Sequence, residues 1–314
     1  SALVYVPAKG DVVLFANIGK RDVPAAKTIT WVEDVRPFGK LPGEVISFFE
    51  GANLTRARIG LAGFEASIPV TDWNAIAKGL PDVQWQTRDE EVTALRAAKE
   101  DWEIAAMTRA AGILDKALSF APGLIRPGEA VRGIIAIIDR VARSAGAEDV
   151  RYMVASGPQA GVALHPVDDR VLAAGDTLLI YAAIEAQRYW AETARTFVLG
   201  PASPALKALH DRAMDRVAAL RAAARPGVAA SALAGVSAGH ALGYGLGNGI
   251  GLDAEEFPLI APNAAGKLVA GATLALRAML HEQNLGVAVA QTVAVGDRGV
   301  TAINEAAPLV EIGC

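Results

Sequence analysis

The chain has 314 residues, of which 52% are hydrophobic and 20% charged, so it can bury a sizeable core, and its length favours two domains. A formal net charge of −4 and a pI of about 5.7, with basic and acidic residues intermixed, argue against nucleic-acid binding, which requires a basic face. The single cysteine, Cys314, excludes a disulfide framework and a cysteine-based metal site.

The N-terminal region, residues 1 to about 90, is predicted to form a small α/β domain from short β-rich runs separated by turns and helical patterns. The expected strands are Leu3–Pro7, Val12–Ala16, Thr28–Val32, Arg58–Leu61 and Val83–Gln86, and the expected helices Gly43–Phe49 and Trp73–Gly79. Because the chain enters a strand at once, we expect it to begin inside its first domain. It shows neither a signal-peptide pattern nor an apolar run of roughly 18 residues, so we expect a soluble cytoplasmic protein without a membrane partner.

A long amphipathic helix, Asp89–Leu118, is predicted to open the second domain. Its expected apolar face comprises Val92, Leu95, Trp102, Ile104, Met107 and Ile113. A second helix follows the turn at 126–128 and ends at Gly146, and a strand is expected at Val150–Ala155. A third helix starts after Ser203-Pro204, and the last third of the chain alternates short strands with loops.

The stretch from Gly175 to Gly200 is predicted to be a hairpin or bent strand pair. Its arms are Thr177–Ile180 and Tyr189–Val198, joined near residues 185–187. Tyr181 and Glu192 stand eleven positions apart on opposite arms, where their side chains could converge on one cavity. An ordinary core hairpin with a surface glutamate is the alternative interpretation.

The order of these signals resembles the superfamily of creatinase, aminopeptidase P and methionine aminopeptidase, whose catalytic domain has the pita-bread fold. The matching segments are 95–111, 156–176, 194–200, 224–233, 247–258 (GNGIGLDAEEFP) and 268–280 (LVAGATLALRAML), and together they cover essentially all of 90–305. The resemblance implies an α+β chain with a creatinase-like N-terminal domain at 1–90 and a pita-bread domain at 91–314. It also implies a homodimer, in which the partner's N-terminal domain borders the active site.

Most members of that superfamily bind two divalent metals through two Asp, one His and two Glu. The resemblance puts those positions on Tyr181, Glu192, Asn248, Arg277 and Ala290. A dinuclear site needs several anionic or imidazole donors, and only Glu192 remains as an ordinary ligand. Arg277 adds a fixed positive charge that it cannot lose by deprotonation. We therefore expect no metal and no cofactor.

One catalytic position of the superfamily is expected to survive. His165, in GVALHPVDD, corresponds to the active-site histidine that serves creatinase as general acid/base in cleaving a C–N bond. An imidazole can transfer protons near neutral pH without a metal. A histidine between an apolar run and a proline is also common as a structural residue, and that alternative stays open.

Further site residues are expected around this group. Glu255 is a candidate second acid/base group, with a solvated acidic pair of Glu255 and Glu256 as the alternative. Asn248 is expected either to orient the substrate or to bond to the backbone of its own glycine-rich loop. Arg277 either anchors a substrate carboxylate through two parallel hydrogen bonds or forms an ion pair with Glu192 inside the pocket. The full expected set is His165, Tyr181, Glu192 and Glu255 for catalysis, and Asn248, Arg277, Trp190 and Glu256 for substrate binding.

These residues support a metal-independent enzyme that hydrolyses a C–N bond in a small, anionic, carboxylate-bearing substrate. A metal-free lyase, decarboxylase or isomerase acting on a small carboxylate is an alternative that uses the same residues. A different class is a catalytically inactive pita-bread binding module, which should expose a large apolar or charged patch. A residual peptidase with one metal has too few ligands. The loop Gly245–Gly251 lacks the G-x-G-x-x-G spacing of a nucleotide site.

Overall fold

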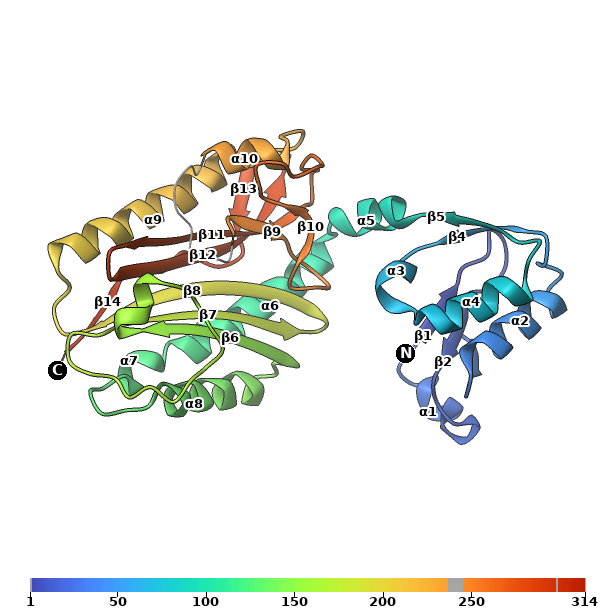
Figure 1. Cartoon of the computed structure of the whole chain (residues 1–314), viewed down its shortest axis with the longest axis horizontal. Helices are drawn as coiled ribbons and strands as arrows, with labels where there is room; N and C mark the ends of the chain where they lie inside the picture. Colours follow the sequence, from blue (N-terminus) through green and yellow to red (C-terminus); the bar gives the residue numbers. More distant parts are fainter. Residues whose placement is uncertain (1, 237–244, 298, 314) are drawn as a thin grey trace. The chain divides into compact units, whose positions relative to one another are not determined.

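The computed structural model describes residues 2–236, 245–297 and 299–313 of the chain. It consists of two compact units, Ser1–Val92 and Thr93–Cys314, which we describe separately (Figure 1). In the described part of the chain, no helix combines the length and the apolarity that crossing a membrane requires.

The first unit is a small α/β structure. Strands β1 (Ala2–Tyr5), β2 (Val13–Ala16) and β3 (Asp34–Pro37) form one sheet in that order, and β4 (Arg58–Leu61) pairs in parallel with β5 (Gln84–Thr87). The helical segments are η1 (Lys20–Asp22), α1 (Val23–Ala26), α2 (Leu41–Gly51), α3 (Phe64–Ser67) and α4 (Val70–Gly79). Phe15, Phe49 and Ile76 are among the side chains buried in its core.

The strand expected at Thr28–Val32 is absent, and β3 follows it instead. The hydroxyl of Thr28 donates to the Ala25 carbonyl at 2.7 Å, and the hydroxyl of Thr30 accepts from the amide of Val32 at 3.1 Å. Such local side-chain bonds stabilise turns at the expense of a strand ladder. Ile29 and Trp31 are consequently 88% and 80% exposed.

The long helix expected at Asp89–Leu118 is two helices, α5 (Asp89–Ala97) and α6 (Asp101–Leu118). The break exists because residues 98 and 99 bond to another strand: Lys99 donates its amide to the Gly271 carbonyl at 2.9 Å. Helix α6 then starts anew, with the Glu103 carboxylate accepting from the amide of Glu100 at 2.7 Å. The expected apolar face is wrong in its first half, since Val92, Leu95 and Trp102 are exposed, whereas Met107 and Ile113 are buried.

The second unit is built on one large, mainly antiparallel sheet in the order β10-β9-β11-β12-β8-β7-β6. These strands are β6 (Asp149–Ser156), β7 (Thr177–Ala186), β8 (Tyr189–Leu199), β9 (Gly247–Gly249), β10 (Glu256–Leu259), β11 (Thr273–Glu282) and β12 (Leu285–Gly296). Strand β13 (Gly299–Ala302) pairs with β12, and β14 (Val310–Ile312) pairs in parallel with β8. The expected hairpin is confirmed as β7 and β8, which are longer than predicted and turn at Gln187-Arg188, both with positive φ.

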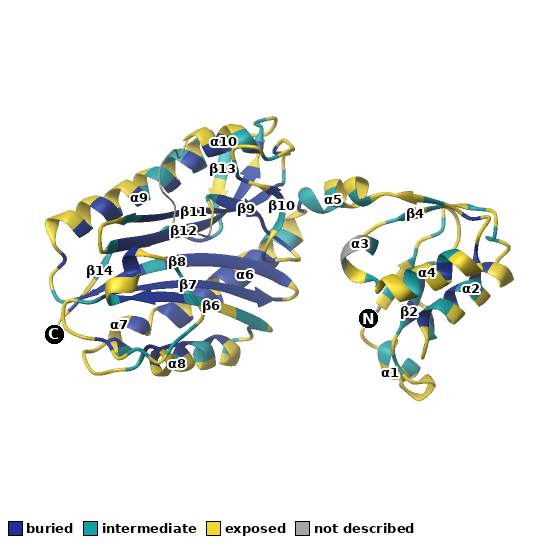
Figure 2. Ribbon diagram, viewed as in Figure 1, coloured by how far each residue is buried: buried dark blue, intermediate teal, exposed yellow. Residues whose placement is uncertain are grey.

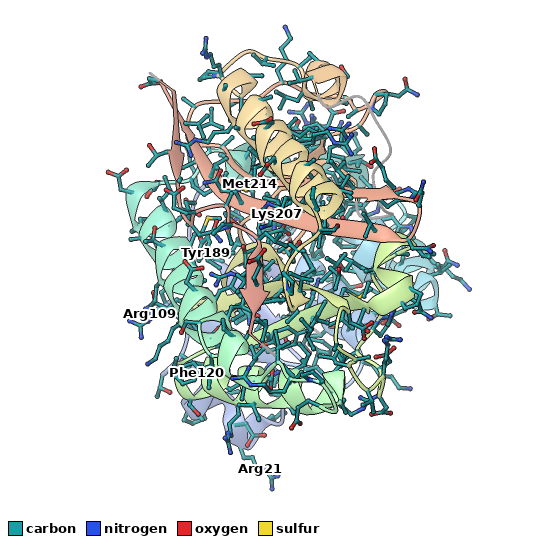
Figure 3. All side chains as sticks on the ribbon, turned by 90° about the vertical axis from the view of Figure 1, so that its left-hand side faces the viewer. Arg21, Arg109, Phe120, Tyr189, Lys207 and Met214 are labelled. Atoms are coloured by element: carbon teal, nitrogen blue, oxygen red, sulfur yellow. The ribbon has the colours of Figure 1, made fainter. Side chains whose placement is uncertain are left out.

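Helices cover the outer face of each half of this sheet (Figure 1). On β6–β8 lie α6, α7 (Ala121–Leu124) and α8 (Val131–Ser144), and on β11–β12 lie α9 (Pro204–Ala223) and α10 (Ala230–Val236). The short η2 (Gly157–Gly161) precedes the loop to β7. Figure 3 marks Lys207 and Met214 along α9, and Figure 2 shows that the central strands are almost wholly buried.

Side chains alternate along each strand, so the sheet has an outer face toward the helices and an inner face. The inner face is a separate core cluster rich in small residues, among them Ala155, Ala183, Ala194, Ala275, Ala288 and Ala290. Tyr181 and Met279 lie in the same cluster. Because alanines leave space above the sheet, the few polar side chains on this face can meet one another.

Candidate functional site

The centre of the inner face is a buried ion pair between Glu192 on β8 and Arg277 on β11. Arg277 Nε lies 2.5 Å from Glu192 Oε1, and Nη2 lies 2.6 Å from Oε2, so both carboxylate oxygens are engaged. The side chain of Glu192 is 0% exposed and that of Arg277 is 3% exposed. Strand β12 lies between these strands, and its Ala290 pairs with both Arg277 and Ala194. The guanidinium reaches Glu192 because the intervening residue is an alanine.

Tyr181 completes this cluster. Its hydroxyl donates to Glu192 Oε2 at 2.7 Å, and its ring centroid lies 5.6 Å from the guanidinium carbon of Arg277. The predicted convergence of Tyr181 and Glu192 is therefore confirmed. We call Tyr181, Glu192 and Arg277 the inner cluster.

The backbone of Glu192 is held as firmly as its side chain. Its amide donates to Thr292 Oγ1 at 2.9 Å, and its carbonyl accepts from Thr292 Oγ1 at 3.0 Å and from Asn304 Nδ2 at 2.8 Å. Sequence reasoning missed Thr292 and Asn304, since neither belongs to a motif. Their signal is structural: Thr292 stands on the strand next to β8, and Asn304 lies just beyond β13.

The charges of the inner cluster are matched. Burial alone would lower the pKa of Arg277, but the charge and hydrogen bonds of Glu192 raise it above its ordinary value, and Tyr181 and Glu255 act in the same direction. The guanidinium therefore stays positive, and it neutralises the single carboxylate buried beside it.

Asn248 is also fully buried and pairs with Ala275 of β11. Its side-chain nitrogen donates to the carbonyls of Gly249 at 2.7 Å and Ala254 at 3.1 Å, so its amide group fixes the loop that follows β9. Within the described residues, Asn248 Oδ1 accepts no hydrogen bond.

Glu256 forms ion pairs with two cationic side chains. Its carboxylate accepts from Lys99 Nζ at 2.7 Å and Arg96 Nη2 at 2.6 Å, and its side chain is 7% exposed. Burial alone would raise the pKa of Glu256, but these two cations lower it below its ordinary 4.5. Glu256 is thus an ion-pair partner that ties β10 to the end of α5 and to the break before α6, and its expected role in substrate binding stays a prediction.

Trp190, expected to bind substrate, is packed into the unit, and its expected role stays a prediction. It is 4% exposed, and the guanidinium of Arg151 lies 4.5 Å from its ring centroid. Glu255, in contrast, is exposed and lines a hollow of about 210 Å³ with Arg96, Asp253 and Phe257.

The structure does not bring His165 to the inner cluster. His165 forms an antiparallel bridge with Val154, with N–O distances of 2.8 Å in both directions, and directly paired residues share a face of the sheet. Val154 belongs to the outer core under α6 and α8, whereas the preceding residue, Leu164, packs against the inner face. The His165 ring instead lies by the Pro166 carbonyl (Nδ1–O 2.8 Å) and Asp168 (Nε2–Oδ2 3.8 Å).

The side chains of the inner face do not fit a dinuclear metal site. Of the five ligand positions, only Glu192 carries a carboxylate, and both of its oxygens are bound by Arg277 and Tyr181. A dication there would meet a buried guanidinium instead of further anionic donors. Throughout the described ranges, no three His, Cys, Asp or Glu side chains are grouped so that they could hold a metal.

Fold and site together define a pita-bread domain whose metal-ligand positions are occupied by an internal ion pair. The family model of metallopeptidase family M24 matches residues 105–297, and the chain belongs to this family. The resemblance and the fold class expected from the sequence are thereby confirmed.

Solved structures of the same fold include two enzymes whose names specify Xaa-Pro substrates. The X-Pro aminopeptidase of Thermotoga maritima is 22% identical, with 96% of this chain and 86% of that one covered and a TM-score of 0.87. The Xaa-Pro dipeptidase of Bacillus anthracis is 20% identical, with 99% and 89% covered and a TM-score of 0.88. At such identities the likeness establishes the fold.

Among curated proteins, the Xaa-Pro dipeptidase of Pyrococcus horikoshii is 24% identical over 168 residues. That match covers 53% of this chain and 48% of the relative, so it spans about half the length of each.

Proposed function

We propose that this chain is a metal-independent member of family M24. The observation that carries the proposal is the pair of hydrogen bonds from Arg277 to both oxygens of Glu192. A metal would have to displace a guanidinium that cannot be neutralised, and it would gain only one carboxylate in return. The guanidinium therefore supplies the positive charge that balances Glu192.

The function we place first is binding without turnover, which is the alternative of a catalytically inactive pita-bread binding module. Three observations support it. His165 faces the outer core, the Asn248 amide group bonds to its own loop, and the phenol of Tyr181 is bonded to Glu192. General acid/base catalysis requires a titratable group with access to the reacting atoms, and these groups are either remote or already bonded.

Hydrolysis of a C–N bond in a small carboxylate-bearing substrate is the second candidate, and Glu255 favours it. Glu255 is exposed, close enough for its charge to raise the pKa of Arg277, and beside the hollow that also contains Arg96. In this scheme the Glu255 carboxylate takes a proton from water, and the water oxygen bonds to carbon. The C–N electron pair leaves with nitrogen, which receives the proton back from Glu255.

Metal analysis of the full chain tests metal independence. We expect less than about a tenth of an equivalent of Zn, Mn, Co or Fe by ICP-MS, both as purified without chelator and after incubation with each metal. We also expect no hydrolysis of Xaa-Pro dipeptides in the presence of added metal. Near-stoichiometric metal, or metal-stimulated hydrolysis, would overturn the proposal.

A screen of small amides and amino-acid derivatives separates the two candidates. A compound that raises the melting temperature and is recovered intact supports binding without turnover. A compound that is cleaved by the wild-type chain and not by Glu255→Gln supports the second candidate.

A further inference from the structure

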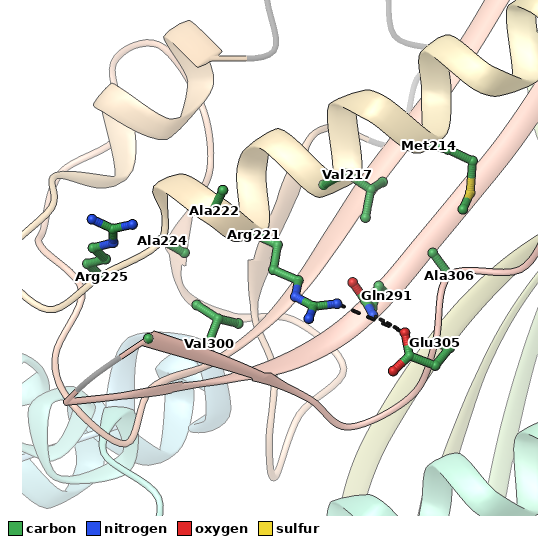
Figure 4. Close-up of a pocket in the computed structure, with 12 residues that line it drawn as sticks. Met214, Val217, Arg221, Ala222, Ala224, Arg225, Gln291, Val300, Glu305 and Ala306 are labelled. Atoms are coloured by element: carbon green, nitrogen blue, oxygen red, sulfur yellow. Dashed lines mark hydrogen bonds and ion pairs between the residues drawn. The ribbon is translucent and has the colours of Figure 1, made fainter.

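A pocket, drawn in Figure 4, lies beside β12 and includes Gln291 in its lining. It has a volume of about 340 Å³ and is formed by the C-terminal half of α9, by Gln291 of β12 and by the segment around β13. Gln291 stands between Ala290 and Thr292 on the strand, so its side chain points away from the inner face. The volume is within the range of about 300 to 1,000 Å³ that small-molecule sites occupy.

The rim of this pocket carries an excess of positive charge. Arg221 and Arg225 line it together with one carboxylate, Glu305. Arg221 Nη1 lies 4.0 Å from Glu305 Oε2, and the two side chains are 41% and 80% exposed, so this ion pair contributes little. Within the described residues, the guanidinium of Arg225 contacts no carboxylate. Both arginines can therefore take an anionic ligand without breaking a strong bond.

The wall of the pocket is apolar. Met214, Val217 and Ala224 of the α9 region face Val300 and Ala306 across it (Figure 4). Gln291, at the base of the pocket, is 2% exposed. Its Nε2 donates to the Asn304 carbonyl at 2.9 Å and to Glu305 Oε2 at 3.3 Å. A charged rim over an apolar wall is the arrangement that an amphiphilic anion requires.

We propose that this pocket binds a small aliphatic carboxylate. Its carboxylate takes the place of Glu305 beside Arg221, because guanidinium groups bind carboxylates through parallel hydrogen bonds, and Arg225 adds positive charge to the rim. Its hydrocarbon chain covers Met214, Val217 and Val300, which removes apolar surface from water. This site is distinct from the inner cluster and does not depend on the function proposed for it.

The pocket is nevertheless joined to the inner cluster by a short chain of bonds. Gln291 donates to the carbonyl of Asn304, and Asn304 donates from its side chain to the carbonyl of Glu192. A ligand that displaces Glu305 also removes its contact with Gln291. Gln291 in turn bonds to Asn304, whose side chain holds the carbonyl of Glu192.

Calorimetric titration of the full chain with sodium hexanoate tests the proposal. We expect saturable binding with a stoichiometry near one. Acetate should bind with lower affinity than hexanoate, by several-fold for each methylene that it lacks. Arg221→Gln should weaken hexanoate binding about tenfold or more, whereas Arg225→Gln, which only lowers the positive charge of the rim, should weaken it less. Arg212→Gln is the matched control, since Arg212 is on the same helix but pairs with Glu282 outside the pocket, at 2.6 Å.

Three outcomes would overturn the proposal. They are the absence of saturable heat in the wild-type chain, equal hexanoate affinity in the Arg221→Gln/Arg225→Gln double variant, and binding of inorganic phosphate or hexylammonium as tight as that of hexanoate. The first two remove the site, and the third shows that it is not selective for an aliphatic carboxylate.

Discussion

Arg277 and Glu192 form their ion pair across a strand that belongs to neither of them. Arg277 is on β11, Glu192 is on β8, and Ala290 of β12 lies between them. Ala290 is in register with Arg277 and Ala194, and its small side chain leaves room for the guanidinium to cross β12 toward Glu192. Three of the five positions that were expected to hold metal thus form one ion-pair arrangement. Arg277 is its cation, Glu192 is its anion, and Ala290 is the small residue on the strand between them.

Removing one member of this pair should destabilise the fold strongly. Arg277→Met leaves the carboxylate of Glu192 buried beside Tyr181, which should lower the free energy of unfolding by about 3 to 5 kcal/mol. The Arg277→Met/Glu192→Leu double variant should lose far less, because no uncompensated charge remains. Urea denaturation of the wild-type chain and of the single and double variants measures the difference, and additive losses would contradict it.

The half-exposed pair of Arg195 and Asp115 is the control for this experiment. Its charged atoms lie 2.6 Å apart, and the side chains of Arg195 and Asp115 are 18% and 43% exposed, against 3% and 0% for Arg277 and Glu192. Because water screens such a pair, Arg195→Met should cost about 1 kcal/mol or less from the lost ion pair.

Tyr181→Phe should cost about 1.5 to 3 kcal/mol of unfolding free energy, since it removes a buried hydrogen bond to a charged acceptor. Tyr152→Phe is the matched control, because the buried hydroxyl of Tyr152 has no hydrogen-bond partner within the described residues. Deleting that hydroxyl should be neutral or slightly stabilising. Equal losses for the two variants would show that the Tyr181 bond contributes nothing specific.

Gly286→Ala should disrupt the contact between β12 and η2. A Cβ atom on Gly286 would overlap the carbonyl oxygen of Ala160, a backbone atom that cannot move alone. We expect a loss of at least about 1 to 3 kcal/mol, as for overpacking elsewhere. Gly112→Ala is the opposite case, since this exposed helical glycine has open space around it and should gain about 0.5 to 1 kcal/mol.

Stability should decline in mild acid because of His210. Burial lowers the pKa of His210 below its ordinary 6.5, and the nearby charge of Asp211 opposes this only in part. The unfolded chain therefore binds a proton at a higher pH than the folded chain, so the contribution is complete above about pH 6.5 and is lost as the pH falls toward the folded value. His210→Leu should flatten this dependence between pH 7 and pH 5 in urea unfolding. An unchanged slope would assign the effect to other groups.

The hairpin and its convergent pair were accessible from sequence because strand alternation is a local rule. Given two β-rich arms and a short turn, residues eleven apart on opposite arms come to lie on one face, and Tyr181 and Glu192 do so. The long helix was not accessible, since the break at residues 98 and 99 depends on a bond to Gly271 far along the chain. Amphipathic periodicity cannot report such a partner.

The position of His165 fell outside sequence reasoning for a related reason. A family pattern places a residue along the chain, but which face it occupies depends on the register of the loop against β6. That register is fixed by the two backbone bonds between Val154 and His165. Similarly, the choice between a free anchor and an ion pair for Arg277 was settled by the space that Ala290 leaves, which becomes visible only when three strands are aligned.

The backbone bridge between Val154 and His165 determines which loop residue faces the inner side of the sheet. The bridge is made by main-chain atoms alone, so it tolerates exchange of the side chains on either side of it. Leu164→His would put an imidazole in place of a side chain that packs against the inner face, while His165 kept its place beside Pro166 and Asp168. A single substitution in this loop would thus bring an imidazole to the inner face, next to a strand pairing that only main-chain atoms make.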